Sequence, residues 1–245
     1  MKKVLIVGAG SAIAQAVGRI FAARGAALCL AGRNTPVLEA IAADLRVRGA
    51  QLVHVENFDA NALATHAQLL VGSELLLGGL DTVLIAHGTL SDQQSCENSA
   101  ELTVRELTTN GVSVVALVTL VAQRFECRRA GTIAVISSVA GDRGRRSNYV
   151  YGSAKALVST FLSGLRQRLR DSGVAVITIK PGFVDTPMTA AFPKGPLWVS
   201  PQRVAQGIVR SIDRSAAVTY LPRFWRPIMF IVRAIPETIF QRLKL

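Results

Sequence analysis

The stretch "KVLIVGAGSAIAQAVGRIFAARG", residues 3–25, joins a short apolar run to a helical pattern through two glycines. The apolar run over residues 3–7 is too short for a helix and suits a strand that is covered on both faces. The helical pattern ends at Gly25, as expected of a helix C-terminus. Gly8 and Gly10 therefore stand in a strand-to-helix turn, where backbone N–H groups can approach a phosphate.

The same order of apolar run and helical pattern recurs to about residue 180. Further strands are predicted at residues 27–31, 51–55, 81–86, 132–137 and 174–180. Strands that alternate with helices are typical of an α/β fold, a Rossmann-like doubly wound parallel sheet. We expect a single domain over residues 1–222, including a substrate lid at about residues 186–200. A basic, aromatic C-terminal tail follows over residues 223–245.

Composition narrows the class of protein. Half of the 245 residues are hydrophobic, which excludes a disordered chain. The three cysteines lack the spacing of a disulfide framework or a zinc site, so we expect no metal and a reducing, cytoplasmic location. No apolar stretch reaches the roughly 18–20 residues of a membrane-spanning helix. The nearest, "VSVVALVTLVA" (112–122), suits a buried or dimer-forming helix.

The charge balance is basic, with 28 Lys and Arg against 16 Asp and Glu, a formal net charge of +12. Such a field attracts nucleic acid, anionic lipid or a phosphorylated substrate. No nucleic-acid-binding motif accompanies the charge, so we expect no nucleic-acid partner.

Arg33, in "AGRN" at the end of the second predicted strand, bears on the cofactor of a dinucleotide-binding turn. A carboxylate near this point accepts from the ribose 2′-hydroxyl of NAD, whereas an arginine can pair with the 2′-phosphate of NADP. Arg33 therefore favours NADP(H), with NAD(H) as the alternative. The G-x-G-x-x-G pattern itself is incomplete, because Ile13 occupies the place of the third glycine.

Tyr151 and Lys155 are four residues apart in "SNYVYGSAK" (147–155), so on a helix they lie on one face. Spacing alone is also met by an ordinary, partly exposed helix face. The chain, however, resembles the short-chain dehydrogenase/reductase family over about residues 3–215. The resemblance is carried by "GAGSAIA" (8–14), "SSVAG" (137–141), "YVYGSAK" (149–155) and "KPGFVDTPM" (180–188).

This resemblance implies a ketone reductase with four catalytic residues, namely Asn110, Ser138, Tyr151 and Lys155. It also implies cofactor contacts at Gly8, Gly10, Ser11, Ala12, Ile13, Arg33, Asn34, Asp59, Ala86, Gly88, Tyr151, Lys155, Val184 and Thr186. The chain departs from the family pattern in two places. Ala12 and Ala14 replace glycines of the first turn, and "IAHG" (85–88) keeps only the last glycine of the family's N-N-A-G.

Tyr151 would protonate the alkoxide as a hydride reduces the ketone. A free tyrosine has a pKa of about 10, and we expect the Lys155 cation to lower that pKa by about three units. By resemblance, Lys155 also holds the nicotinamide ribose, Ser138 contacts the substrate oxygen, and Asn110 positions a relay water.

Two basic segments bear on the substrate. Arg143, Arg145 and Arg146 lie on a loop that we expect at the rim of the site, where arginine forks suit phosphate, although a solvated loop explains them equally well. The tail mixes cationic with apolar and aromatic residues, which is typical of a segment in an anionic membrane surface. The alternative is an arm that contacts another subunit.

A narrower resemblance, to bacterial decaprenylphosphoryl 2-keto-pentose reductases, rests on "GSAIA" (10–14), "AHGTL" (86–90), "VAGDRGR" (139–145) and "NYVYG" (148–152). It implies a lipid-linked keto sugar of cell-envelope glycan synthesis, supplied by an oxidase partner, with the enzyme peripheral on the inner face of the cell membrane. Phe192, Leu197 and Trp198 would line the lid. The alternatives are a soluble 3-oxoacyl-carrier-protein-type reductase and a non-catalytic nucleotide sensor. We expect a homodimer or homotetramer.

Overall fold

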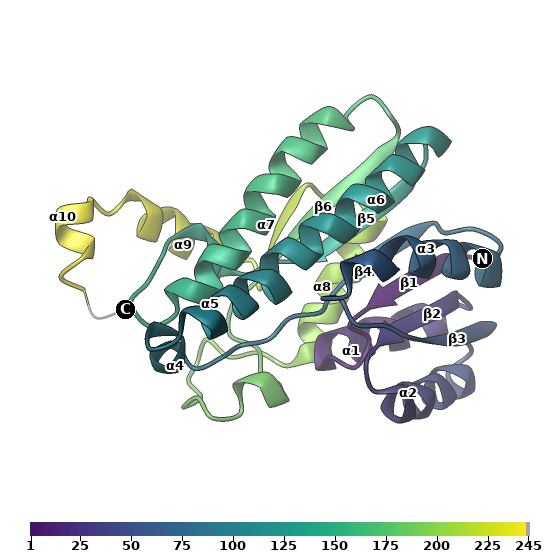
Figure 1. The fold of residues 1–245 in the computed structure, drawn as a ribbon, viewed down its shortest axis with the longest axis horizontal. Coiled ribbons are helices and arrows are strands. Elements are labelled where there is room, and N and C mark those ends of the chain that lie inside the picture. Colours follow the sequence, from purple (N-terminus) through teal and green to yellow (C-terminus); the bar gives the residue numbers. More distant parts are fainter. Residues whose placement is uncertain (244–245) are drawn as a thin grey trace.

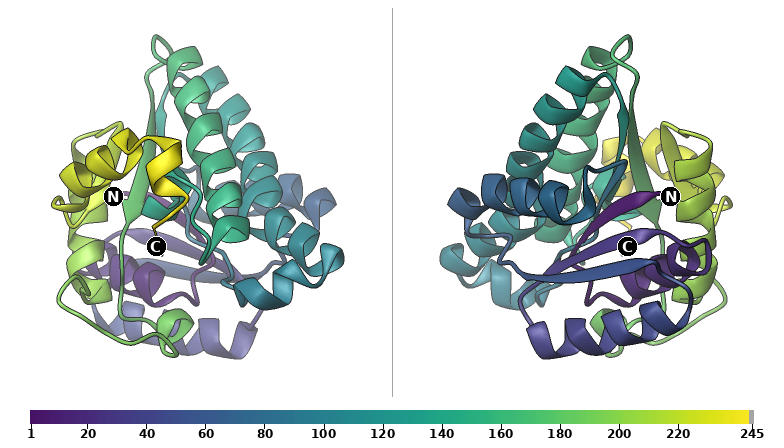
Figure 2. Two further views of the ribbon diagram at one scale, coloured as in Figure 1. Left: turned by 90° about the vertical axis from the view of Figure 1, so that its left-hand side faces the viewer. Right: turned by 90° about the vertical axis from the view of Figure 1, so that its right-hand side faces the viewer.

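The computed structural model describes residues 1–243. Within them a seven-stranded parallel sheet is covered by helices on both faces (Figures 1 and 2). The spatial order is β3-β2-β1-β4-β5-β6-β7. The strands are β1 (Lys3–Val7), β2 (Ala27–Gly32), β3 (Leu52–Asn57), β4 (Thr82–Ile85), β5 (Gly131–Ile136), β6 (Val174–Pro181) and β7 (Val218–Leu221).

Two hydrophobic clusters fill the space between the sheet and its helices. One face packs against α1 (Ala12–Ala23), α2 (Thr35–Val47) and α8 (Pro201–Asp213). The other packs against α3 (His66–Leu77), α6 (Ser113–Arg128) and α7 (Tyr149–Arg168). The shorter elements are η1 (Leu63–Thr65), α4 (Gln93–Glu97), α5 (Ala100–Leu107), the π-helical turn η2 (Thr108–Val112), η3 (Val139–Asp142), η4 (Pro187–Thr189), α9 (Trp225–Ala234) and α10 (Glu237–Phe240).

The predicted doubly wound sheet is confirmed, and the six predicted strands agree with β1 to β6 within two residues at each end. Sequence reasoning missed β7. This edge strand has four residues and only its last, Leu221, is buried, so it shows neither a continuous apolar run nor a clear alternation.

The stretch over residues 112–122 lies in a continuous helix, Ala100–Arg128, that includes α5, η2 and α6. By length and composition this helix could cross a membrane, with a mean hydropathy of 1.3 in its most apolar window. In this structure, however, the apolar side chains of α6 pack in the core. Val114, Leu117, Val118 and Val121 of α6 are buried in the core, as expected of the predicted buried helix.

The described part of the tail folds back onto the loop after β5. Trp225 and Met229 of α9 are buried against Val139 of η3, and Figure 1 shows α9 and α10 at the edge of the molecule opposite the N-terminus. Residues 244 and 245 of the predicted tail lie outside the described residues. The division into a domain and a tail stays a prediction.

Arg143, in the loop after β5, binds the segment that contains α9 and α10. The sequence predicts instead that Arg143 binds phosphate at the rim of the site, together with Arg145 and Arg146. Its guanidinium donates to the carbonyls of Val232 (2.8 Å) and Ile235, pairs with Glu237 (2.8 Å) and lies 3.6 Å from the centroid of the Phe240 ring. The sequence could not indicate this role, because the partners of Arg143 lie about ninety residues further along the chain.

Candidate active site

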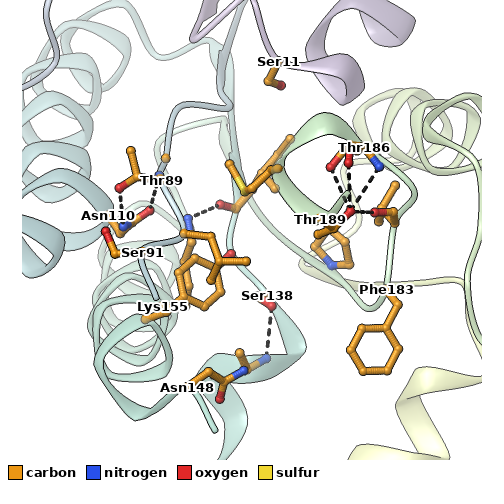
Figure 3. Close-up of a pocket in the computed structure, with 18 of the residues that line it drawn as sticks. Ser11, Thr89, Ser91, Asn110, Ser138, Asn148, Lys155, Phe183, Thr186 and Thr189 are labelled. Atoms are coloured by element: carbon orange, nitrogen blue, oxygen red, sulfur yellow. Dashed lines mark hydrogen bonds between the residues drawn. The ribbon is translucent and has the colours of Figure 1, made fainter. Parts of the chain in front are cut away.

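A cavity of about 660 Å³ opens at the carboxyl ends of β1, β4, β5 and β6. Ligands of open parallel sheets bind at this edge. All four predicted catalytic residues line the cavity, and Figure 3 shows three of them, Asn110, Ser138 and Lys155. So do these predicted cofactor contacts: Gly10, Ser11, Ala12, Ile13, Ala86, Gly88, Val184 and Thr186.

The glycine turn leaves room for a ligand. Gly8 has φ +79°, and a Cβ there would lie 2.4 Å from the backbone nitrogen of His87, so the turn needs glycine at this place. A Cβ on Gly10 would meet nothing within 4 Å. The protein therefore does not itself require glycine at position 10, whereas a ligand that approaches this backbone would.

Helix α1 begins beside that open space. The hydroxyl of Ser11 accepts from the N–H of Ala14 at 3.2 Å and caps the helix. The N–H groups of Ala12 and Ile13 precede that capped position in the first turn, where they have no intrahelical acceptor, and both residues line the cavity. A helix N-terminus of this kind suits a pyrophosphate. The turn thus fits a dinucleotide despite Ala12 and Ala14 in place of the family's glycines.

Arg33, Asn34 and Asp59 do not line the cavity. Arg33 is exposed just after β2, and Asn34 caps α2 by accepting from the Val37 N–H at 3.2 Å. Asp59 follows β3 and accepts from the N–H of Asn61 at 3.0 Å. These residues come from the neighbouring strand ends, so their contacts with the adenosine end of a cofactor stay predictions.

Asn110 sits in the π-helical turn η2 and is fully buried. Its Oδ1 accepts from the Thr89 N–H at 3.0 Å, and its Nδ2 donates to the Thr89 hydroxyl and to a carboxylate oxygen of Glu106, each at 3.1 Å. Thr89 also donates to Glu106 at 2.7 Å. The Asn110 amide is therefore fixed in one orientation.

Glu106 is a buried carboxylate of the site that sequence reasoning missed. Only 4% of the residue is exposed, and it lines the cavity beside Asn110. The i, i+4 spacing from Asn110 is the signal that could have indicated it, because residues at that spacing share a helix face.

Ser138, Tyr151 and Lys155 are held together by the close approach of η3 to α7. A Cβ on Gly141 would lie 2.6 Å from the backbone carbon of Lys155, and one on Gly152 would lie 2.9 Å from the Ala140 oxygen. Only glycines permit this contact between backbones. It sets Ser138, which stands just before η3, against the first two turns of α7.

Lys155 is buried, with 3% of the residue exposed. Its ammonium donates to the carbonyl oxygen of Ile136 at 3.2 Å and lies 5.5 Å from the centroid of the Tyr151 ring. Burial lowers the pKa of Lys155 to about 8, and the charge of Glu106 acts in the opposite direction.

The expected lowering of the Tyr151 pKa is not what the structure gives. Burial raises the pKa of Tyr151 to about 12; the hydroxyl of Ser138 opposes this rise and the charge of Glu106 adds to it. Desolvation of the phenolate is the largest cause of this rise, and burial also disfavours the charge of Lys155. Tyr151 consequently keeps its proton at neutral pH, as an acid that protonates an alkoxide must.

Of the other residues predicted at the rim of the site, some line the cavity and others do not. Phe192 and Trp198 line the cavity, whereas Leu197 is not among the lining residues. Of the loop arginines, Arg145 lines the cavity and Arg146 is exposed. The predicted lid, about residues 186–200, is held near its end by the chain that precedes it: Val184 bridges to Val199, and the Asp185 N–H donates to the Val199 carbonyl at 2.9 Å.

Comparison with known proteins identifies the family. The model of the short chain dehydrogenase family matches residues 2–196. An uncharacterized oxidoreductase of Mycobacterium tuberculosis is 39% identical over 240 residues, 98% of this chain and 96% of the relative. The chain belongs to the short-chain dehydrogenase family. A second uncharacterized oxidoreductase, from Streptomyces coelicolor, is 36% identical over 99% of this chain and 96% of its own length.

Solved structures agree with this short-chain dehydrogenase assignment. A short-chain dehydrogenase from Sphingobium yanoikuyae, in complex with NADPH, has a TM-score of 0.83 and 25% identity, and the match covers 97% of each chain. The actinorhodin polyketide ketoreductase with NADPH has a TM-score of 0.81 over 90% of this chain and 95% of its own, but at 21% identity it supports the fold alone. The protein is thus an NAD(P)-dependent oxidoreductase with a Rossmann-like fold.

Proposed function

We propose that this short-chain dehydrogenase reduces the keto group of a polyprenyl-phosphate-linked 2-keto-pentose to a secondary alcohol, in the synthesis of cell-envelope glycans. The observation that carries the proposal is the cavity itself. Beside the four predicted catalytic residues it is lined by apolar and aromatic side chains, including Leu90, Val139, Phe183, Met188, Phe192 and Trp198. Such a wall suits a lipid-linked substrate better than a small polar ketone.

In this proposal the reduction needs one hydride and one proton, and NADPH supplies the hydride when bound. Tyr151 donates its proton to the carbonyl oxygen as the alcohol forms, while the Ser138 hydroxyl donates a hydrogen bond to that oxygen. The Lys155 cation stabilises the phenolate that Tyr151 becomes, and a proton that reaches Lys155 restores the tyrosine. Asn110 holds the water that connects Lys155 to solvent.

NADPH is the proposed cofactor, with NADH as the alternative. The open backbone at Gly10 and the start of α1 suit a pyrophosphate, and the exposed Arg33 after β2 supports the choice, because an arginine can pair with a 2′-phosphate. The Sphingobium yanoikuyae relative in complex with NADPH supports the same choice.

The tail supports a place at the inner face of the cell membrane. Phe183 and Val139 of the cavity wall contact Trp225 of α9, so the helix adjoins the site. On its outer side α9 exposes Phe230 (76%) and Ile231 (63%), with Arg226 and Arg233 on the same short helix. Apolar side chains beside cations are typical of a helix in an anionic lipid interface. An oxidase that makes the keto sugar would act upstream at the same surface.

The test is NADPH and NADH oxidation by the purified protein with a polyprenyl-phosphoryl 2-keto-pentose in anionic vesicles. We expect turnover with NADPH that falls by a factor of about 10³ or more in Tyr151→Phe, while that variant still binds NADPH. Tyr149→Phe is the matched control, because Tyr149 is 43% exposed and not among the lining residues.

Absence of turnover on the lipid-linked sugar, with Tyr151-dependent turnover of a 3-oxoacyl thioester, would overturn the proposed substrate and favour the carrier-protein reductase. Undiminished turnover in Tyr151→Phe would overturn the proposed acid. Binding of NADPH without turnover of any ketone would favour a nucleotide sensor.

A further inference from the structure

The three arginines of the loop between β5 and α7 have different surroundings. Arg143 is engaged by the carbonyls and the carboxylate of the tail segment. Arg146 is exposed. Arg145 lines the cavity, and its Nε is buried without a hydrogen-bond partner among the described residues. The loop thus presents one arginine, Arg145, to the interior of the site.

The charge of Arg145 is poorly compensated by the protein. Burial lowers the pKa of Arg145, which means that the surroundings disfavour its charge, and Asp142 is the carboxylate that opposes this effect. Both oxygens of Asp142 already have other partners, Lys180 and the Tyr220 hydroxyl, the latter at 2.7 Å. A partly buried cation whose neighbouring carboxylate is already engaged is costly unless a ligand supplies the missing anion.

Asn148, in the same turn as Arg145, also has a buried polar atom without a hydrogen-bond partner among the described residues. The Asn148 N–H donates to the Arg145 carbonyl at 3.0 Å, so the two residues are held close together. Asn148 stands at the N-cap of α7, where asparagine commonly caps, yet its side chain makes no capping hydrogen bond. Instead its Oδ1 is buried without a partner among residues 1–243, and the residue lines the cavity.

The two residues lie on the substrate side of the site. In Figure 3 Asn148 and Ser11 of the glycine turn stand at opposite ends of the view, with Ser138 and Lys155 between them. A group held at Asn148, and at the Arg145 to which its backbone is hydrogen-bonded, therefore lies beyond Ser138 and Lys155 from the glycine turn. This arrangement favours a part of the substrate rather than a phosphate of the cofactor.

We propose that Arg145 and Asn148 form a subsite for an oxyanion and a neighbouring hydroxyl of the substrate. The guanidinium of Arg145 donates to a phosphate oxygen, and Oδ1 of Asn148 accepts from a sugar hydroxyl. The subsite rests on the proposed function in its choice of a phosphorylated sugar, and it assigns that recognition to two residues. Buried groups left unpaired in the free protein would give strong discrimination against a ketone that lacks these groups.

The first experiment measures equilibrium binding of farnesyl phosphate, a short prenyl phosphate, and of farnesol to the full-length protein. We expect Arg145→Met to weaken binding of farnesyl phosphate at least tenfold and to change binding of farnesol far less. Arg146→Met is the control, because Arg146 is exposed and is expected to leave both affinities unchanged. Equal affinity of wild type and Arg145→Met for farnesyl phosphate would overturn the subsite.

The second experiment compares kinetics on the lipid-linked keto sugar. Asn148→Ala is expected to raise KM at least fivefold while its affinity for farnesyl phosphate, which carries no sugar, stays within twofold of wild type. Turnover of the lipid-linked sugar with normal KM in both variants would overturn the subsite and leave the proposed function standing. Arg145-dependent binding of farnesyl phosphate without turnover of the sugar would keep the oxyanion subsite and overturn the proposed substrate.

NADPH affinity separates the subsite from the cofactor site. We expect Arg145→Met to bind NADPH as wild type does. A tenfold loss of NADPH affinity in this variant, with binding of farnesyl phosphate unchanged, would place Arg145 at the cofactor and overturn the assignment. Thermal unfolding of each variant checks that the loop and α7 remain folded.

Discussion

Glu106 is the buried charge that acts on both titrating groups of the site. It raises the pKa of Lys155 and that of Tyr151, and its carboxylate accepts from Asn110 and Thr89. Glu106 thus holds Asn110 in place and changes the pKa values of Tyr151 and Lys155. Both of its carboxylate oxygens already accept hydrogen bonds from the protein. Glu106 is therefore a positioning residue.

The pH dependence of reduction tests this role. Lys155, with a pKa of about 8, is a cation below that pH and loses its charge above it, so kcat/KM is expected to fall as the pH rises through about 8. Glu106→Gln removes the charge that raises the Lys155 pKa, so the fall moves to lower pH. Glu101→Gln, whose side chain is 83% exposed on α5, is the control. A profile for Glu106→Gln that superimposes on wild type would contradict the role.

At the residue scale the sequence predicted the reacting groups better than their surroundings. Ser138, Tyr151 and Lys155 follow motifs, and the structure brings them together on one cavity. The raised pKa of Tyr151 depends on desolvation by residues distant in the chain, which no spacing encodes. The engagement of Arg143 by the tail likewise depends on the folded arrangement.

The contact between η3 and α7 determines whether the catalytic residues meet. A methyl group at Gly141 would lie 2.6 Å from the Lys155 carbonyl carbon and 2.7 Å from its oxygen, and neither backbone atom can move independently of α7. The helix and the turn must separate to admit it. Ser138 would then shift relative to Tyr151.

Gly141→Ala is therefore expected to lower kcat at least tenfold and to cost about 1–3 kcal/mol of the free energy of unfolding, as overpacking commonly does. Gly144→Ala is the matched control on the same loop, since a Cβ there meets nothing within 4 Å. Steady-state kinetics and denaturant unfolding measure the two effects. Equal kcat in both variants would show that the close backbone contact does not hold the site.

Helix α9 buries one side against the loop after β5 and exposes the other, so its exposed side chains can be changed without disturbing the buried contact. Changing Phe230 and Ile231 to serine together leaves Trp225 and Met229 in place, so the fold is expected to persist. If both side chains enter lipid, their loss costs about 3 kcal/mol, roughly a hundredfold in partition onto anionic vesicles.

Sedimentation with vesicles measures this partition, and Leu75→Ser is the control because Leu75 is 82% exposed on α3, away from the tail. Should the double variant sediment like wild type, the membrane role of α9 would be wrong. A smaller mass in solution for the double variant, without a change in sedimentation, would indicate the subunit arm instead.

At the level of elements, the sequence predicted those with a strong periodicity and missed those defined by packing. Strands β1, β2, β4, β5 and β6 are largely apolar runs between covering helices, so their pattern is plain, and β3 keeps a shorter apolar pattern over Leu52–Val55. The four-residue edge strand β7 and the π-helical turn η2 have no such pattern. Their conformation depends on neighbours, namely β6 for β7 and the buried partners of Asn110 for η2.

For the whole molecule, the outer surface of the helices α5, α6 and α7 predicts self-association. Val104 is 60% exposed on α5, Leu157 is 44% exposed on α7, and Val112 at the end of η2 is 43% exposed. Leu157 packs next to Gly111, since a Cβ on that glycine would lie 2.9 Å from its side chain, so Val112 and Leu157 lie close together. Apolar side chains grouped on a surface mark an interface.

We expect the protein to form a homodimer or homotetramer through this face, with a solution mass at least twice the 26.1 kDa of one chain. Leu157→Glu places a carboxylate on this face, next to Val112. Burying a charge in an apolar interface costs several kcal/mol, so the variant is expected to dissociate at micromolar concentration. Val47→Glu, at a site 89% exposed on α2, adds the same charge elsewhere and should keep the wild-type mass. Light scattering distinguishes the two variants, and an undiminished mass for Leu157→Glu would move the interface to another face, with the tail as the next to test.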